Sequence, residues 1–357
     1  MIRKQDSLDY HSKGRPGKIG VSATKPCITP REIRLAYLPG ATFPAEEIAK
    51  DPSLVYKYTS RGNLVGVVTD GSAVPGMGNV GPRAAKPVQE GIAILLKRLA
   101  DIDVTDLELN QTDVDGFVET MRLLEPTFGA LNLKDIQAPH GLHIYDRLRE
   151  VIEIPVFHEN LYGTAVVALA ALINALELVD KQMDEVRVVI CGAGTVGIGC
   201  ARLLLKQGVL PENLLMYDVD GLIHTRRKDL HQYQQEFAAN SPLETLADGL
   251  VGADVFLGAS AGGVLNMEMI RSMARFPIVF AMATPEPEIS YEEARASRQD
   301  AIVATALDMY PNAIVDLLSF PYILRGALDV QATSITEGML LAAARSLAEL
   351  AREDVPE

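Results

Sequence analysis

The chain has 357 residues, of which 48% are hydrophobic and 22% charged, and its formal net charge is −14 at pH 7. That length exceeds what one hydrophobic core usually serves, so two domains are expected. The negative charge argues against nucleic acid or an anionic membrane as a partner, because both require a basic protein face, and favours a small-molecule ligand.

Cysteine usage and the N-terminus indicate the compartment. The cysteines at positions 27, 191 and 200 are widely spaced and odd in number, which supports neither a disulfide framework nor a zinc site. The first twenty residues carry charges where a signal peptide requires an apolar stretch, and no uninterrupted apolar run is long enough to cross a membrane. We therefore expect a cytoplasmic protein without a membrane partner.

The N-terminal half alternates strands and helices after a polar arm. Glycine and proline interrupt any helical pattern in the first thirty residues, which predicts an arm that packs on something else, with a dimer partner as a candidate. Residues 64–72 (LVGVVTDGS) are typical of a buried strand ending in a turn, and a glycine-rich stretch then leads to a helix near Pro87. Short apolar strands and amphipathic helices alternate through residues 103–151, so this half is α/β.

An apolar segment separates the two halves of the chain. Residues 164–177 (TAVVALAALINALE) are apolar nearly all round, which is typical of a buried helix. We place the domain boundary at its start, with one domain over residues 1–163 and the other over residues 164–357.

The second half contains a dinucleotide-binding pattern. Residues 186–190 (VRVVI) form a continuous apolar strand that leads into G-x-G-x-x-G and then into a helix. The first glycine makes the tight turn, the second lets the backbone approach a pyrophosphate, and the third lets helix and strand pack closely. The residues expected to contact the cofactor in this loop are Gly192, Gly194, Thr195, Val196 and Gly197.

The following strand bears on the choice of cofactor. It reads LLMYD and ends at Asp218, about twenty residues beyond the glycines, where a carboxylate can accept a hydrogen bond from a ribose 2′-hydroxyl. Asp218 therefore favours NAD. Arg226 and Arg227 follow closely and could instead meet a 2′-phosphate, so NADP stays open.

Two later strands, over residues 253–258 and 277–281, end in loops that contain Ser260 and Thr284. Ligands of doubly wound sheets lie at the carboxyl ends of the strands. We therefore expect Ser260 and Thr284 to line the nicotinamide end of the cofactor crevice. The acidic stretch 286–293 that follows is expected to be a solvated helix start.

Several segments match one family of enzymes, among them YHSKGRPGKIGV, LAYLPG, GNLVGVVTDGSAVPGMGNVGP, VICGAGTVGIG and FPYILRGALD. With these segments the chain resembles the malic enzymes, in particular the short bacterial form. The resemblance implies an N-terminal α/β substrate domain followed by a Rossmann domain with a doubly wound parallel sheet. It also implies oxidation and decarboxylation of malate with NAD or NADP, a divalent metal, a Tyr and a Lys for proton transfer, and a homodimer.

The proton-transfer residues of the family are only partly present. Tyr37, in LAYLPG, stands where the resemblance places the catalytic tyrosine, and its phenol could protonate an enol intermediate. The family lysine falls in a stretch like PVMEGKA, where this chain has Ile92, which cannot transfer a proton.

The metal positions implied by the resemblance are altered. A Glu-Asp pair before I-x-A-P appears as Lys134 and Asp135, and an Asp-Asp pair before x-x-G-T-A appears as Glu159 and Asn160. Mg²⁺ and Mn²⁺ require several hard oxygen ligands in near-octahedral geometry. We therefore expect no catalytic metal.

The substrate positions differ as well, which puts malate in doubt. An Asn-Pro pair after FAMA appears as Thr284-Pro285, and N-Q-V-N-N appears as the segment from Asn312 to Asp316. We retain Asn160, Asn312 and Asp316 as the residues expected to face the substrate.

Lys134 admits three interpretations. Its ammonium could replace the metal as a fixed positive charge beside Asp135, or it could act as a base if its pKa falls. The third interpretation is an ion pair that only fills the space of the metal. Glu159 could be a carboxylate base in a rebuilt site or a solvated residue beside a turn.

These observations favour a metal-independent NAD-linked oxidoreductase that acts on a small 2-hydroxy acid other than malate, with or without decarboxylation. Tyr37 is the first candidate for proton transfer, supported by Lys134 and Asp135, and Glu159 is the second. One alternative is an orthodox metal-dependent malic enzyme. The other is an NAD-binding pseudoenzyme that regulates a partner.

Overall fold

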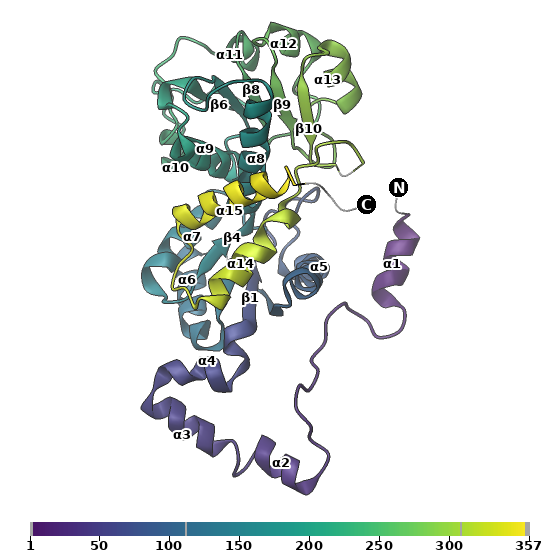
Figure 1. Ribbon diagram of the computed structural model, residues 1–357, viewed down its shortest axis with the longest axis vertical. Helices are drawn as coiled ribbons and strands as arrows, with labels where there is room; N and C mark the ends of the chain where they lie inside the picture. The colour runs from purple at the N-terminus through teal and green to yellow at the C-terminus, as the bar shows by residue number, and fades with distance from the viewer. Residues whose placement is uncertain (1–2, 111–112, 308, 354–357) are drawn as a thin grey trace.

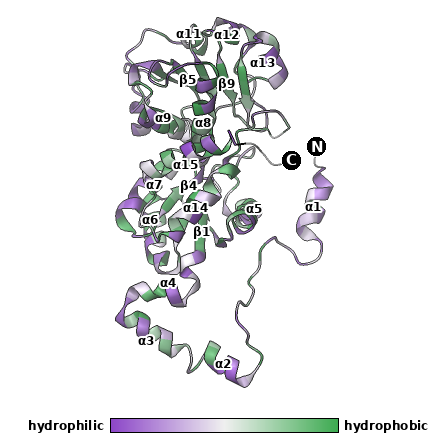
Figure 2. Cartoon of the chain, in the orientation of Figure 1, coloured by the Kyte–Doolittle hydropathy of each residue, from purple (hydrophilic) through white to green (hydrophobic). Residues whose placement is uncertain are grey.

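The computed structural model describes residues 3–110, 113–307 and 309–353. The chain forms two lobes, and each contains one sheet flanked by helices (Figure 1). An extended N-terminal arm projects from the lobe that contains the first sheet. Apolar residues concentrate in the strands of both sheets (Figure 2), as continuous buried parallel strands require. The α/β class and the Rossmann-type second sheet are therefore confirmed.

The first sheet has four parallel strands in the order β2-β1-β3-β4. The register aligns Leu133 at the end of β3 with His158 at the end of β4, so the residues that follow these strands meet at one edge. The elements of this region are β1 (Leu64–Thr69), α5 (Pro82–Ala100), β2 (Asp103–Glu108), α6 (Val114–Leu124), β3 (Ala130–Leu133), α7 (His140–Val151) and β4 (Val156–His158).

Helix α5 begins five residues earlier than the sequence pattern predicted. Pro82 occupies its first turn, where a missing N–H costs nothing, and Gly81 before it adopts φ 75°, which favours glycine. Pro87 consequently lies inside the helix instead of at its start.

The second sheet has six strands in the order β10-β9-β8-β5-β6-β7. Five are parallel, and the short β7 pairs antiparallel with β6. Its strands are β5 (Val188–Cys191), β6 (Leu214–Asp218), β7 (Gly221–Leu222), β8 (Val255–Gly258), β9 (Ile278–Ala281) and β10 (Ile302–Thr305). Its helices are α9 (Thr195–Gln207), α10 (Gln232–Gln235), α11 (Leu246–Leu250), α12 (Met267–Ser272) and α13 (Tyr291–Ser297).

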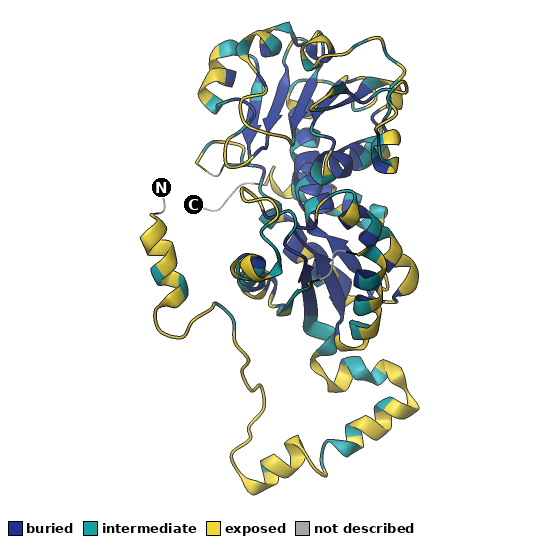
Figure 3. Cartoon of the chain, turned by 180° about the vertical axis from the view of Figure 1, so that it is seen from behind, coloured by how far each residue is buried: buried dark blue, intermediate teal, exposed yellow. Residues whose placement is uncertain are grey.

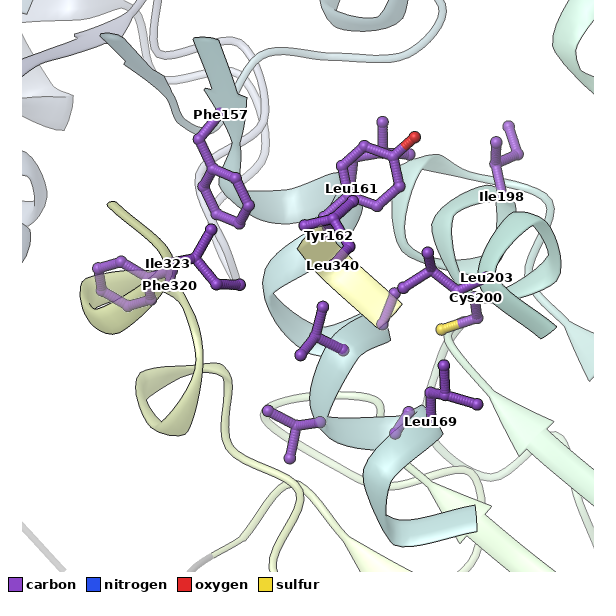
Figure 4. Packing of buried hydrophobic residues seen from close by; sticks show 14 of the residues in the cluster. Phe157, Leu161, Tyr162, Leu169, Ile198, Cys200, Leu203, Phe320, Ile323 and Leu340 are labelled. Atoms are coloured by element: carbon purple, nitrogen blue, oxygen red, sulfur yellow. The ribbon is translucent and has the colours of Figure 1, made fainter. Parts of the chain in front are cut away.

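Helix α8 (Glu159–Leu178) forms the buried centre between the two sheets. It contacts β3 and β4 on one side and α9 and β9 on the other, and Figure 4 shows its side chains packed against those of α9 and of α14 (Phe320–Asp329). A Cβ on Gly199 of α9 would lie 1.7 Å from the Leu161 carbonyl oxygen, so the two helices approach closely only because residue 199 is glycine. By length and composition α8 could cross a membrane, but 67% of its most apolar 18 residues are buried here, as in a core helix.

The C-terminal segment returns to the first lobe. Helix α14 (Phe320–Asp329) packs on α5, and α15 (Glu337–Leu350) packs on α8 and α9. A hydrogen bond of 2.6 Å from Arg325 to Asn63 joins α14 to the start of β1. The boundary between residues 163 and 164 stays a prediction, and it falls inside α8.

The N-terminal arm carries four short helices. They are α1 (Lys4–Ser12), α2 (Pro30–Ala36), α3 (Thr42–Lys50) and α4 (Val55–Tyr58), and none of their described residues is buried. The arm runs exposed along most of its length (Figure 3). It touches α5 where the Lys18 amide donates to the Glu90 carboxylate at 2.9 Å.

Candidate active site

The glycine-rich loop after β5 has the geometry expected for a dinucleotide. Gly192 adopts φ 117°, and a Cβ on Gly197 would lie 1.8 Å from the Gly192 carbonyl oxygen, so both positions require glycine. Gly194 is the exposed N-cap of α9, and Thr195 and Val196 in the first turn are half-buried. Free backbone N–H groups and the positive end of the helix dipole therefore face outward, where a pyrophosphate would bind.

Asp218 at the end of β6 is paired with an arginine. Its Oδ1 lies 2.7 Å from Arg227 Nη1, and the same guanidinium contacts Asp229 at 2.5 Å and Asp220 at 3.6 Å. The Arg227 side chain is only 10% exposed. Three carboxylates therefore bind the Arg227 guanidinium, which the sequence analysis considered as a possible contact for the 2′-phosphate of NADP.

The loops after β8 and β9 contain Ser260 and Thr284, as predicted, and a buried carboxylate joins them. Glu288 is 0% exposed and accepts hydrogen bonds from Ser260 and from the Ala283 amide. The prediction that this acidic stretch is a solvated helix start is wrong at Glu288. The helix begins later, at Tyr291, because Ser290 caps it.

Four predicted residues come together at the carboxyl edge of the first sheet. Lys134 and Asp135 follow β3, and Glu159 and Asn160 begin α8 directly after β4. Lys134 Nζ lies 2.6 Å from Glu159 Oε1 and 3.8 Å from Asp135 Oδ1, and all three side chains are buried. Glu159 is therefore not a solvated turn residue.

Amide side chains orient the two carboxylates. Asn160 Oδ1 accepts from the Asp135 amide at 2.8 Å, and its Nδ2 donates to Asp135 Oδ1 at 3.3 Å. Asn132 donates to Glu159 Oε2 at 2.7 Å, and Gln89 of α5 donates to Asp135 Oδ2 at 3.3 Å. Asp135 adopts φ 56°, so its backbone is held in the left-handed region that favours glycine.

Asp316 joins this cluster, whereas Asn312 does not. The Asp316 side chain lies against Gly163, one helical turn after Glu159, and its charge acts on both Lys134 and Glu159. Asn312 instead donates to the carbonyl of Val303 at 3.1 Å and stabilises the turn after β10. The segment that carries Asp316 therefore connects the end of the second sheet to the start of α8.

The pKa of Lys134 bears on whether its side chain is a fixed positive charge or a base. Burial alone would lower the pKa of Lys134, but attraction by Glu159, Asp135 and Asp316 outweighs it and raises the pKa well above its usual value. This direction favours the ammonium form of Lys134 and argues against a role as a general base. Burial raises the pKa of the Glu159 carboxyl, although Lys134 and Asn132 oppose the increase.

The donor set does not fit a divalent metal. An ammonium lies 2.6 Å from the carboxylate of Glu159, and both functional groups of Asn160 are used by Asp135. Among the described residues, no group of three or more His, Cys, Asp or Glu side chains is arranged to hold a metal ion. A dication would have to displace Lys134 from the position that it occupies.

Comparisons with known proteins identify the family. The family model for the malic enzyme NAD binding domain matches residues 161–357, and that for the malic enzyme N-terminal domain matches residues 16–113. The chain belongs to the malic enzyme family.

Relatives of this malic enzyme family member differ in length. The NADP-dependent malic enzyme of Rhizobium meliloti is 49% identical over 100% of this chain and 47% of its own. The NADP-dependent malic enzyme of Halomonas elongata is 47% identical over 99% of this chain and 84% of its own. The chain thus spans about half the length of the first of these relatives. The crystal structure of malic enzyme from Pyrococcus horikoshii matches with a TM-score of 0.93 at 38% identity, covering 98% of this chain and 84% of that one.

Tyr37 is not brought to the cluster within one chain. It is the residue that ends α2, a helix that lies far from β4 (Figure 1), and it is 71% exposed. Ile92, at the position of the family lysine, is partly buried and packs against the core. Within a single copy of this malic enzyme family member, the cluster therefore contains neither proton-transfer group that the resemblance implies.

Sequence reasoning missed three buried polar residues at or near the site. Gln89 and Asn132 are fully buried beside Asp135 and Glu159, and Glu288 is buried between two loops. Asn132 could have been found, because it is the polar residue in an otherwise apolar strand (ALNL). The other two have no comparable local signal.

Proposed function

We propose that this malic enzyme family member is an NAD-linked oxidoreductase that oxidises a small 2-hydroxy acid without a divalent metal ion. The observation that carries the proposal is the buried Lys134 ammonium, 2.6 Å from Glu159 and 3.8 Å from Asp135 at the implied metal position. Family membership and the glycine-rich loop after β5 support the dinucleotide. Relatives named NADP-dependent and NAD-dependent both exist.

The cluster can supply the electrostatics of alcohol oxidation. NAD⁺, when bound, accepts a hydride. Lys134 would stabilise the negative charge that develops on the substrate oxygen, as a preorganised cation in a buried site does. Glu159 would accept the hydroxyl proton, since its raised pKa brings it closer to the pKa range of an efficient general base. Asn132 holds Glu159, and Asn160 holds Asp135, so neither carboxylate must reorganise during the reaction.

Charge at the cluster argues against malate. One ammonium faces three carboxylates, those of Asp135, Glu159 and Asp316. A substrate with two carboxylates would meet this excess of negative charge without a dication to offset it. We propose a monocarboxylic 2-hydroxy acid instead.

We also propose that a second copy of the chain supplies Tyr37. The arm that carries it exposes large apolar side chains, which in a monomer mark an interaction surface. Tyr37 lies on this arm, away from the cluster of its own chain. Exposed apolar residues on either side of Tyr37 are Val21, Ile28, Ile33, Leu35, Leu38 and Phe43.

The decisive test of the proposed function is thermal denaturation with NAD⁺ and a panel of 2-hydroxy acids, in EDTA and in Mn²⁺. A ligand that binds the native state raises the melting temperature. We expect NAD⁺ with a monocarboxylic acid to stabilise the protein in EDTA, and the same pair to produce NADH. Stabilisation and turnover only with malate and Mn²⁺ would contradict the proposal and establish the orthodox activity.

The pairing of Asp218 with Arg227 predicts a preference for NAD over NADP. A 2′-phosphate would have to displace three carboxylates from Arg227. In Asp218→Asn the guanidinium regains a free N–H, and a charge-assisted bond to the phosphate should raise the ratio of NADPH to NADH affinity by about tenfold. Fluorescence titrations with the two reduced nucleotides measure this ratio.

The matched control is Asp220→Asn, because Asp220 is 72% exposed and lies 3.6 Å from Arg227. Its affinity ratio should stay within about twofold of the unaltered chain, since exposed ion pairs are weak. An unchanged ratio in Asp218→Asn would show that Asp218 does not select the cofactor.

A further inference from the structure

Glu288 links two loops at the carboxyl edge of the second sheet. Its Oε1 accepts from the Ser260 amide at 2.9 Å and from Ser260 Oγ at 3.3 Å, and its Oε2 accepts from the Ala283 amide at 3.0 Å. Ser260 lies in the loop after β8, and Ala283 lies in the loop after β9. One carboxylate therefore determines the spacing of two loops.

The carboxylate packs against the backbone at the end of β8. It is 0% exposed, and a Cβ on Gly258, the last residue of β8, would lie 2.3 Å from the Glu288 carboxyl carbon. Backbone bonds hold the same segment in place, since the Leu265 amide donates to the Glu288 carbonyl at 3.0 Å. A buried carboxylate is costly unless its hydrogen bonds are made, and here backbone and hydroxyl donors make them.

The link continues to the glycine-rich loop. Ser260 Oγ lies 3.5 Å from Cys191 Sγ, at the end of β5, and a Cβ on Gly192 would lie 2.3 Å from the Ala259 carbonyl oxygen. Glu288 thus acts on the ends of β5, β8 and β9, which are neighbours in the sheet. In doubly wound sheets the dinucleotide binds across these strand ends.

We propose that Glu288 is a positioning residue for the cofactor. It holds the Ser260 and Ala283 loops at the spacing that the nucleotide requires. Through Ser260 it also helps to position the glycine-rich loop after β5. The inference rests on the proposed use of NAD. Glu288 itself does not contact the cofactor, because its side chain is fully buried between the two loops.

The test compares Glu288→Gln with a control at the opposite edge of the same sheet. A glutamine has one acceptor oxygen, so its NH₂ group would face the Ser260 or the Ala283 amide, and one loop would be released. The control is Asp254→Asn, since Asp254 accepts from the Arg187 amide at 2.9 Å and pairs with Lys181 at 2.7 Å before β8 and β5 begin. The chain has no tryptophan, so NADH fluorescence is followed directly.

We expect Glu288→Gln to weaken NADH binding by about tenfold, because bonds to a charged group are lost at the loops. Asp254→Asn should lower the melting temperature comparably but leave the NADH dissociation constant within about twofold. If Glu288→Gln binds NADH as the unaltered chain does, the role of Glu288 is structural alone and the inference is overturned.

A second variant covers the case in which Glu288→Gln does not fold. Ser260→Ala removes the hydroxyl between Glu288 and Cys191 but keeps the amide, and it should weaken NADH binding by about threefold with little change in melting temperature. Unaltered binding in Ser260→Ala overturns the part of the inference in which Glu288 acts through the Ser260 hydroxyl on the loop after β5. Failure of the unaltered chain to bind NADH at all would contradict the proposed function itself, which is a different result.

Discussion

Lys134→Met is expected to abolish turnover and to lower the free energy of unfolding by about 3–5 kcal/mol, because it leaves buried carboxylates without their counter-charge. Glu159 and Asp135 are both 0% exposed, so water cannot replace the ammonium without rearrangement. Chemical denaturation measures the loss of stability, and NADH production measures the loss of activity. A stable and active Lys134→Met would contradict the assigned role.

The pH dependence of this variant has a definite sign. Burial already raises the pKa of Glu159, and removing Lys134 raises it further. An acid whose pKa is higher in the folded state binds protons there, so stability falls as the pH rises above the unfolded carboxyl pKa of about 4.3. Lys134→Met should therefore be most stable in mild acid and lose stability toward neutral pH more steeply than the unaltered chain.

The double variant Lys134→Glu, Asn160→Asp tests the metal interpretation directly. It restores the carboxylates that the family resemblance places at these positions, beside the retained Asp135. We expect it to bind Mn²⁺ at least about tenfold more tightly than the unaltered chain, since hard cations require several oxygen ligands. Calorimetric titration with Mn²⁺ measures the difference. Equally tight binding by the unaltered chain would show that Lys134 does not exclude the metal.

Tyr37→Phe is expected to reduce turnover by about a hundredfold or more, which is the usual contribution of a positioned proton-transfer group. The melting temperature should change little, because Tyr37 is 71% exposed on the arm. Steady-state NADH production and thermal denaturation separate the two effects. Unchanged turnover would remove Tyr37 from the reaction.

Mixing Tyr37→Phe with a variant of the buried cluster tests whether Tyr37 acts in a second copy. Asp135→Asn is the partner variant, because it removes a charge that faces Lys134, which should impair turnover, and it leaves the arm intact. In equal co-expression, half of the dimers contain one chain of each kind, and each such dimer has one site with both native residues if Tyr37 acts across the dimer. Activity should then recover to about a quarter of that of the unaltered dimer. If Tyr37 acts within its own chain, every site lacks one residue and no activity returns.

Local features of the sequence determined the nucleotide-binding half. The apolar strand, the three glycines and the following helix lie within about twenty residues, as the dinucleotide pattern requires. Gly192 and Gly197 are required by the local backbone, the first for its positive φ and the second for its close approach to the Gly192 carbonyl. Asp218 was also predictable from a local feature, because it ends the strand that follows the glycines. The loss of the metal carboxylates at Lys134 and Asn160 was likewise visible by resemblance alone.

The tertiary structure decided how distant charges pair. Lys134 and Glu159 are 25 positions apart, and they meet because β3 and β4 are parallel neighbours with Leu133 opposite His158. Asp316 reaches the same cluster from beyond the second sheet, whereas Asn312, four residues earlier, turns back to Val303. The sequence pattern contains no strand register, so it could propose these residues but not their contacts.

The same limit explains the two predictions that changed most. Glu288 lies in an acidic stretch and resembles a solvated residue, but the folding of two loops buries it against Gly258. Tyr37 matches a family motif, yet the arm carries it away from the cluster of its own chain. Residue type and spacing determined which side chains were available here, and long-range packing decided which of them share a site, because that depends on contacts between segments far apart in sequence.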